Sequence, residues 1–326
     1  MVEMEKNKIL GISFNQYQGC FSCATEKGFK IFNTYPFKDT FQRDFDGGIG
    51  IVEMLYRSNI LAIVGGGSKP KYPSNKVMLW DDHQMKCIGE LSFKTNVLGV
   101  KLRKDMVVVV LEQKIYVYNF SDLKLLDTIE TIDNPKGICC ITPKDTAILI
   151  CPDKQNGKAF VQNFETGQKQ SYKAHDNGLS CMSISTDGSI FVTASTKGTL
   201  IRVFNTANGT QLHELRRGSD KAEIISLAID KNRRFLACSS DKQTIHIYSL
   251  AGEKASKKES KSDESKEDKK HEAPEIKNQT SVLSIFKGII PYFDSEWSFA
   301  QFRIPDSRSY VAFGPEDKNV IIGTII

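Results

Sequence analysis

Apolar and polar positions alternate in short runs along the whole chain, with the two-residue period of β-strands and almost no helical periodicity. One phrase recurs: an apolar run, a small polar turn, and a second run that ends in an anchor residue, usually aromatic, followed by a polar residue. FSCATEKGFKIFN and FVTASTKGTLIRVFN are two examples. Successive anchors are 48, 38, 44, 42 and 44 residues apart, at Phe32, Trp80, Tyr118, Gln162, Phe204 and Tyr248.

This spacing is typical of the four-stranded blades of a β-propeller, which repeat about every 40–45 residues. The stretch YVAFGPEDKNVIIGT makes a seventh repeat, with Gly323 at the anchor position. We therefore predict an all-β protein that forms a single seven-bladed β-propeller over residues 1–326, with four-stranded antiparallel blades. We expect the last blade to lack its outer strand, because no further strand follows this repeat.

A charged tract separates the sixth and seventh repeats. Residues 253–275 contain no aromatic or β-branched residue, and their lysines and acids nearly balance. Such a segment cannot bury enough apolar surface to fold, so we predict a disordered charged loop over 253–280, inserted in blade six. The alternative is a linker between two domains. The loop is favoured because the residues after the tract complete the seventh repeat.

Composition narrows the function classes. The formal charge of +5 is mild, and no groove of basic and aromatic residues stands out, so we expect no nucleic-acid binding. No run of 18 apolar residues could span a membrane. We find no acid pair, nucleophile motif or metal-ligand spacing, and therefore predict no enzyme activity, no cofactor and no metal. The eight cysteines, including Cys20 and Cys23 of CFSC, are expected to be reduced structural thiols.

Two adjacent arginines in LHELRRGSDKAE carry the candidate chemistry. On a strand, Arg216 and Arg217 point to opposite faces, so they cannot hold one ligand together. They either serve two separate sites or protect an edge strand from aggregation. Arg202 and His246 lie at the same place in consecutive repeats, two residues before the anchor, as two related pockets would require.

The stretch ASTKGTLIRVFNTANGTQLHELRRG, followed by FLACSSDKQTIHIYSL, resembles the PROPPINs, the WIPI-type phosphoinositide-binding propellers of autophagy. SFNQYQGCFSCATEKGFKIFN, DNPKG and SEWSFAQFRIP agree with the resemblance, which is closest to members with Leu before Arg-Arg-Gly. It implies a membrane effector that recognises phosphatidylinositol 3-phosphate and the 3,5-bisphosphate. It also implies that the two arginines serve two pockets on opposite sides of the strand.

Carried over position by position, the resemblance implies a first pocket, site one, of Thr193, Ser195, Gly198, Thr199, Arg202 and Arg216. The second pocket, site two, consists of Arg217, Gly218, Ser240, Thr244 and His246. Gly218 is expected to let the backbone pass closely, and protonation of His246 below about pH 6.5 to tighten site two. His175 is a possible neighbour of site one. Two alternatives to a role in phosphate binding stay open. Arg202 could pair with an acid on a solvated face, and His246 could be a histidine packed in the core.

The segment 281–293 has apolar residues at three-to-four spacing. It is either a membrane-inserting helical face or the outer strand of blade six. The candidate insertion residues are Ile285, Phe286, Ile289, Ile290 and Phe293.

The resemblance also implies a cytoplasmic protein, recruited peripherally to autophagosome precursors and to endosomal or vacuolar membranes. We expect a monomer that contacts an autophagic lipid-transfer protein through blades one to three. Tyr17 stands in that region where the closest family members carry an acid. The competing function is a generic protein-interaction scaffold without specific lipid binding.

Overall fold

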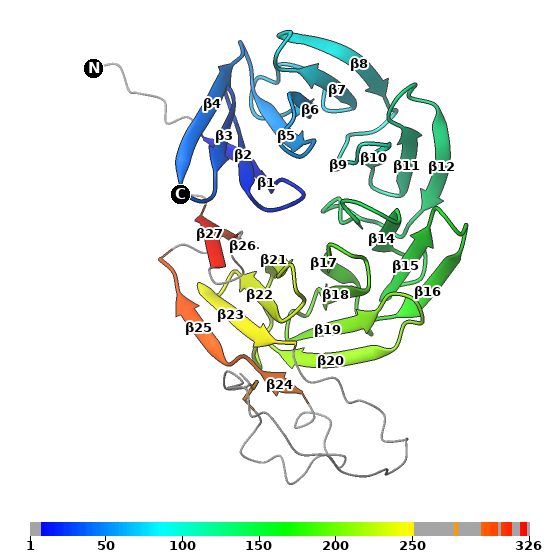
Figure 1. The fold of residues 1–326 in the computed structure, drawn as a ribbon, viewed down its shortest axis with the longest axis vertical. Coiled ribbons are helices and arrows are strands. Elements are labelled where there is room, and N and C mark those ends of the chain that lie inside the picture. The colour runs from blue at the N-terminus through cyan, green and yellow to red at the C-terminus, as the bar shows by residue number, and fades with distance from the viewer. Residues whose placement is uncertain (1–7, 251–276, 280–294, 306–307, 315–319, 325–326) are drawn as a thin grey trace, which may run out of the picture.

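The computed structural model describes residues 8–250, 277–279, 295–305, 308–314 and 320–324. Its sheets are arranged as the blades of a propeller around a central axis, in the order of the sequence (Figure 1). Each four-stranded blade is antiparallel, and its strands run outward from the axis in chain order. The predicted all-β propeller of four-stranded antiparallel blades is confirmed.

The strands of blades one to three are β1 (Ile9–Phe14), β2 (Cys20–Thr25), β3 (Gly28–Asn33), β4 (Lys38–Asp44), β5 (Ile49–Met54), β6 (Ile60–Gly65), β7 (Lys76–Asp81), β8 (Lys86–Ser92), β9 (Gly99–Leu102), β10 (Met106–Val110), β11 (Lys114–Asn119) and β12 (Leu125–Glu130). Those of blades four and five are β13 (Cys140–Ile141), β14 (Ile148–Pro152), β15 (Lys158–Asn163), β16 (Lys169–Lys173), β17 (Leu179–Ile184), β18 (Ile190–Ser195), β19 (Leu200–Asn205) and β20 (Gln211–Arg216). The later strands are β21 (Ile224–Ile229), β22 (Phe235–Ser240), β23 (Thr244–Ser249), β24 (Glu296–Trp297), β25 (Ala300–Arg303), β26 (Ser309–Phe313) and β27 (Val320–Thr324).

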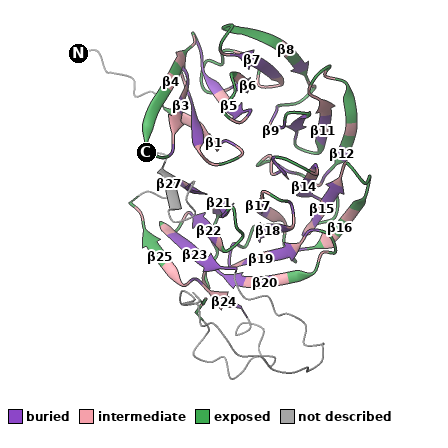
Figure 2. Ribbon diagram, in the orientation of Figure 1, coloured by how far each residue is buried: buried purple, intermediate pink, exposed green. Residues whose placement is uncertain are grey.

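The position of each strand in its blade follows its polarity. The second strands are apolar and almost wholly buried, as in MVVVV of β10, whereas the outer strand β4, KDTFQRD, is mostly exposed. Figure 2 shows the largely exposed outer strands, such as β4, β8 and β12, at the rim of the ring and the buried second strands inside it. The apolar side chains form clusters between neighbouring blades, from blades one and two round to blade six and β26. Burial between blades therefore supplies the main stabilisation of the ring.

The seventh repeat differs from the prediction. The structure describes six blades, five of four strands and one of five, and in place of the predicted seventh blade a two-stranded sheet, β26–β27. A last blade that lacks only its outer strand would have three strands, but β26 is the inner strand of this sheet. Ser239 of β22 donates to the backbone oxygen of Ser309 (2.6 Å), just as Ser22 of β2 donates to that of Val52 in β5 (2.7 Å). The described part of the seventh sheet thus contains its two inner strands, not three strands.

Blade six contains the insertion. Its third strand β23 pairs with β25, so β25 is the outer strand and the alternative that 281–293 supplies it is wrong. The predicted loop 253–280 lies almost entirely outside the described residues, as do the five candidate insertion residues. Before β25, the returning chain forms β24, which pairs in parallel with β20 and adds a fifth strand to blade five (Figure 1). The C-terminal end of the β20 edge, at Leu215 and Arg216, is therefore covered.

Candidate functional site

Arg216 is the last residue of β20, the outer of the four antiparallel strands of blade five, and Arg217 follows it directly. Arg216 pairs with Leu200, while the backbone N–H of Arg217 donates to the carbonyl of Thr199 (2.9 Å). Alternation along β20 points them to opposite faces of the blade. The neighbouring Leu215 packs into the apolar cluster between blades five and six, so Arg217 is on the blade-six side and Arg216 on the blade-four side.

The strand register places the main side chains of site one on the blade-four face. Thr193 is paired with Arg202, which is paired in turn with Glu214, and directly paired residues share a face. The imidazole Nε2 of His175 lies 3.0 Å from Oγ1 of the buried Thr193. The structure therefore brings Thr193, Arg202 and Arg216 to one face and confirms that His175 is their neighbour.

Arg202 already has partners from its own chain. Its guanidinium contacts the Glu214 carboxylate at 2.9 Å and donates to the backbone oxygen of Ala174 at 2.6 Å. The pairing of Arg202 with an acid is thus confirmed, but the face is half-buried rather than solvated. An anion bound here would share the guanidinium with Glu214, so Arg202 contributes less positive charge to site one than the sequence implied.

Gly198 and Thr199 form the turn between β18 and β19 and lie next to Arg217 through their backbone. Nε of Arg217 donates to the carbonyl of Gly198 (3.0 Å), and its Nη2 donates to the carbonyl of Asp220. Gly198 has φ +66°, and a Cβ there would lie 1.9 Å from the carbonyl oxygen of Ala222. The turn assigned to site one thus holds the arginine of site two.

The other side chains of site two come from β22 and β23. Ser240 accepts from the N–H of Lys242 (3.3 Å), and the Thr244 hydroxyl donates to the Lys242 carbonyl (3.2 Å), so both hydroxyls brace the connecting turn. His246 is buried, and its Nδ1 lies 3.1 Å from Oγ of Ser298. A Cβ added at Gly218 would meet no atom within 4 Å. The described residues therefore do not support the prediction that Gly218 lets the backbone pass closely.

Both histidines are neutral at pH 7. Burial, with a smaller contribution from the Arg217 charge, lowers the pKa of His246 to about 4. Burial and the Arg202 charge lower the pKa of His175 to about 4 as well. The expectation that His246 is protonated just below pH 6.5 is therefore wrong for the ligand-free protein. The ring acts as a neutral hydrogen-bonding group in site two.

A sequence model of the PROPPIN family matches residues 9–271. The chain belongs to the PROPPIN family. Autophagy-related protein 18e of Arabidopsis thaliana is 39% identical over 325 residues, which cover 97% of this chain and 81% of that protein. SVP1-like protein 2 of Schizosaccharomyces pombe is 37% identical over 275 residues, covering 83% and 74%.

Solved PROPPIN structures share the fold. Kluyveromyces lactis Hsv2 with its complete loop 6CD has a TM-score of 0.76 at 26% identity, covering 98% of this chain and 90% of that one. The complex of KlAtg21 with the coiled coil of AgAtg16 matches with a TM-score of 0.67 at 27% identity, covering 75% and 81%. The insertion in this PROPPIN lies between the third and fourth strands of blade six.

Residues that follow this insertion in the chain also contact the two sites, and the sequence did not predict them. Nε of Arg216 donates to Oγ of the buried Ser295 (2.7 Å), and Ser298 contacts His246. Arg303 is exposed on β25 and pairs with Thr244. All three residues lie in SEWSFAQFRIP, a stretch that agrees with the family resemblance.

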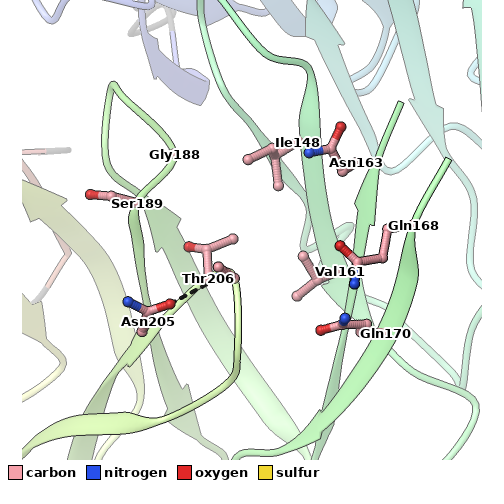
Figure 3. A pocket seen from close by; sticks show the side chains of 10 residues that line it. Ile148, Val161, Asn163, Gln168, Gln170, Gly188, Ser189, Asn205 and Thr206 are labelled. Atoms are coloured by element: carbon pink, nitrogen blue, oxygen red, sulfur yellow. Dashed lines mark hydrogen bonds between the residues drawn. The ribbon is translucent and has the colours of Figure 1, made fainter. Parts of the chain in front are cut away.

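A separate pocket of about 210 Å³ lies between blades four and five, at the opposite end of β19 from Leu200. Figure 3 shows Ile148 and Val161 on one side and Asn205 and Thr206 on the other. No charged side chain lines it. The pocket therefore lacks the cations that a phosphate needs and is distinct from both arginine sites.

The cysteines of this PROPPIN are free thiols. Burial raises the pKa of Cys23 to about 11 and that of Cys139 to about 12, which keeps them protonated and unreactive. Within the described ranges, no group of three or more His, Cys, Asp or Glu side chains is placed to hold a metal ion. The same ranges contain no helix of the length and hydropathy needed to cross a membrane.

Proposed function

We propose that this protein is a phosphoinositide-binding membrane effector in autophagy, which recognises phosphatidylinositol 3-phosphate and the 3,5-bisphosphate through sites one and two and recruits partner proteins to the membrane. The observation that carries the proposal is the placement of Arg216 and Arg217 on opposite faces of one strand end. Membership of the PROPPIN family and the names of the autophagy-related relatives support it.

The chemistry of both sites suits a phosphate monoester. A guanidinium offers a planar fork of five N–H donors, which matches phosphate oxygens better than an ammonium group does. In Arg217, bonds to backbone carbonyls use Nε and Nη2 and orient the group, while Nη1 has no acceptor among the described residues. Hydroxyls and a neutral imidazole nearby can donate to the remaining oxygens. These bonds orient the Arg217 guanidinium of site two before a ligand binds.

Liposome flotation across a panel of phosphoinositides tests the proposal. We expect Arg216→Ala and Arg217→Ala each to weaken binding to 3-phosphorylated lipids at least tenfold, because a charged hydrogen bond contributes about 1.5–3 kcal/mol and attachment combines two weak sites. Arg57→Ala is the matched control, since this arginine is in blade two, where it donates to Gly19 and Asn33. Binding by the double arginine variant equal to wild type would refute the lipid proposal.

That last outcome would favour the competing function, a protein-interaction scaffold. The solved complex of KlAtg21 with a coiled coil of AgAtg16 provides a precedent for protein partners. We propose that an autophagic lipid-transfer protein binds blades one to three, where Tyr17 is 53% exposed and stacks on Tyr56 with ring centroids 5.5 Å apart. The expected location is cytoplasmic, with peripheral recruitment to autophagosome precursors and to endosomal or vacuolar membranes.

The apolar segment 281–293 completes the proposal as a membrane-inserting element. Its sequence supports this role, since large apolar residues recur at helical spacing. Substituting Phe286 and Phe293 by Ser would weaken liposome binding but leave binding of soluble head groups unchanged. Unchanged flotation of this double variant would remove the segment from the proposal.

A further inference from the structure

The chain that returns from the insertion touches both arginine sites. We call residues 295–301 the return segment. It contains β24, which pairs with Leu215 and Arg216 of β20, and the start of β25, which pairs with β23 (Figure 1). The segment thus crosses from blade five to blade six at the two faces that carry Arg216 and His246.

Several contacts fix the return segment to blades five and six. The Glu296 carboxylate accepts from the Asn278 amide (2.6 Å) and lies 3.1 Å from Nδ1 of His213. The backbone of Trp297 exchanges two hydrogen bonds with Gln279 (2.8 and 3.1 Å). The Asn278 amide in turn bonds both backbone groups of Ser249 at 2.7 Å. A segment held by this many partners can position the side chains that it presents.

Two hydroxyls from the return segment meet the sites. Ser295 accepts from Nε of Arg216 at 2.7 Å, and Ser298 lies 3.1 Å from Nδ1 of His246. Both serines are buried, at 2% and 1% exposure. A hydrogen bond to a buried hydroxyl restricts the orientation of the guanidinium or imidazole that makes it, because the bond requires a defined distance and direction between donor and acceptor.

The proton positions at Ser298 follow from its partners. The amide Nε2 of Gln301 also contacts Oγ of Ser298, at 3.0 Å, and an amide nitrogen can only donate. Among the described groups that contact the Ser298 hydroxyl, only Nδ1 of His246 can accept its proton. The neutral ring then carries its own proton on Nε2, the nitrogen on the side away from Ser298.

We propose that the return segment is a positioning layer shared by both sites: Ser295 orients the guanidinium of Arg216 in site one, and the relay from Gln301 through Ser298 holds His246 of site two as the Nε2–H tautomer, ready to donate to a phosphate oxygen. The inference rests on the proposed phosphoinositide function. It adds Ser295, Ser298 and Gln301 as positioning residues, since none of them needs to touch the ligand.

The tautomer is measured first, without any lipid. Long-range ¹H–¹⁵N NMR spectra of the imidazoles distinguish Nδ1–H from Nε2–H. We expect wild type to show His246 as Nε2–H, Ser298→Ala to show a mixture of tautomers, and Ser298→Thr to restore the wild-type pattern. Gln301→Leu is a second variant that leaves the hydroxyl in place and removes one donor to it. An Nδ1–H ring in wild type would overturn the relay.

Head-group binding is measured second, by calorimetry with soluble short-chain phosphatidylinositol 3-phosphate. In an Arg216→Ala background, which reports site two, Ser298→Ala should weaken binding about three- to tenfold and Ser298→Thr should not. In an Arg217→Ala background, which reports site one, Ser295→Ala should weaken binding by a similar factor, while Ser298→Ala should have no effect. Each serine is therefore the matched control for the other.

The outcomes separate this inference from the proposed function. If the double variant Arg216→Ala, Arg217→Ala binds the head group as wild type does, the proposed function fails. If the arginine variants lose binding but the serine variants bind normally, the positioning layer is refuted and the lipid sites stand. A change of tautomer in Ser298→Ala without a change in affinity also refutes the positioning role.

Discussion

Burial sets the charge of the two histidines beside the arginines, although their spacing in the sequence gave no sign of it. His175 and His246 have pKa values of about 4 in the folded protein, against about 6.5 for an unperturbed histidine. Between these values the unfolded chain binds more protons than the folded one. Stability is therefore full above pH 6.5 and is lost as the pH falls toward 4.

We predict that the free energy of unfolding, measured by urea denaturation, falls from pH 7 to pH 4.5 by up to about 3 kcal/mol for each of these histidines. His175→Gln and His246→Gln should each flatten this dependence, because a glutamine has no proton to gain. His83→Gln is the control, since His83 is exposed on blade two. An equal pH slope in all three variants would contradict the assignment.

At the scale of single residues, the sequence predicts those features that depend only on adjacent residues of the chain. Strand alternation alone separates Arg216 from Arg217, and the structure keeps them on different faces. Ser295 and Ser298 could not be predicted, because 79 residues separate Ser295 from Arg216 and the insertion intervenes. Likewise nothing in the sequence marks Arg103, a buried arginine that joins blades three and four through the backbone oxygens of Thr142 and Asp145.

Among the elements, the turn between β18 and β19 has the tightest constraint near the sites. Gly198→Ala would place a Cβ 1.9 Å from the carbonyl oxygen of Ala222 in a left-handed conformation, φ +66°. We predict a loss of about 3 kcal/mol or more in the free energy of unfolding, together with weaker head-group binding, since Gly198 also holds Arg217. Urea denaturation and calorimetry measure the two effects.

Gly167→Ala is the matched control for this substitution. Gly167 has φ +70°, but a Cβ there meets nothing within 4 Å. This variant should lose only about 1 kcal/mol, the cost of the left-handed conformation itself. Equal losses at the two positions would show that the contact with Ala222 does not matter.

The contacts at the base of the insertion lead to a prediction about thermal stability. Asn278 bonds both backbone groups of Ser249 at 2.7 Å and so closes the loop before β24 begins. Replacing residues 253–275 by a short Gly-Ser linker should leave the thermal unfolding midpoint unchanged, because loop length has little effect on the closure entropy. Asn278→Ala in the linker variant should lower the midpoint. Unfolding of the linker variant alone would show that the tract is part of the fold.

The seventh repeat shows why the position of a strand within its blade is hard to predict from this sequence. The turn after an inner strand and the turn after a second strand are both short and polar, so the two phrases look alike. The spacing of strand starts does not distinguish them either. β1 and β2 begin 11 residues apart, as do β26 and β27, but β13 and β14 begin 8 residues apart, the same offset as β2 and β3.

For the whole molecule, the ring closes where the seventh sheet meets blade one. The backbone N–H of Phe313 in β26 donates to the side-chain oxygen of Gln18 at 2.6 Å. We predict that Gln18→Asn, which is too short to reach but tolerates the φ of +59° at this position, speeds amide exchange in β26 and lowers the free energy of unfolding by about 1 kcal/mol.

Hydrogen–deuterium exchange of Gln18→Asn against Gln113→Asn measures this closure. Gln113 is an exposed glutamine that bonds the Asp133 side chain and takes no part in the closure. Protection of β26 that is the same in both variants would mean that packing alone closes the ring.

The insertion in blade six also has a consequence for the order in which the blades form. In the first five blades, each antiparallel set of four strands comes from one continuous stretch of chain, so a blade can assemble soon after the ribosome releases it. In blade six, 50 residues lie between Ser249 at the end of β23 and Ala300 at the start of β25. Because non-local pairing slows folding, we expect the nascent chain to hold a half-formed blade six, with the Arg216 edge of blade five uncovered, until synthesis passes β24. Both arginine sites would then mature late and together.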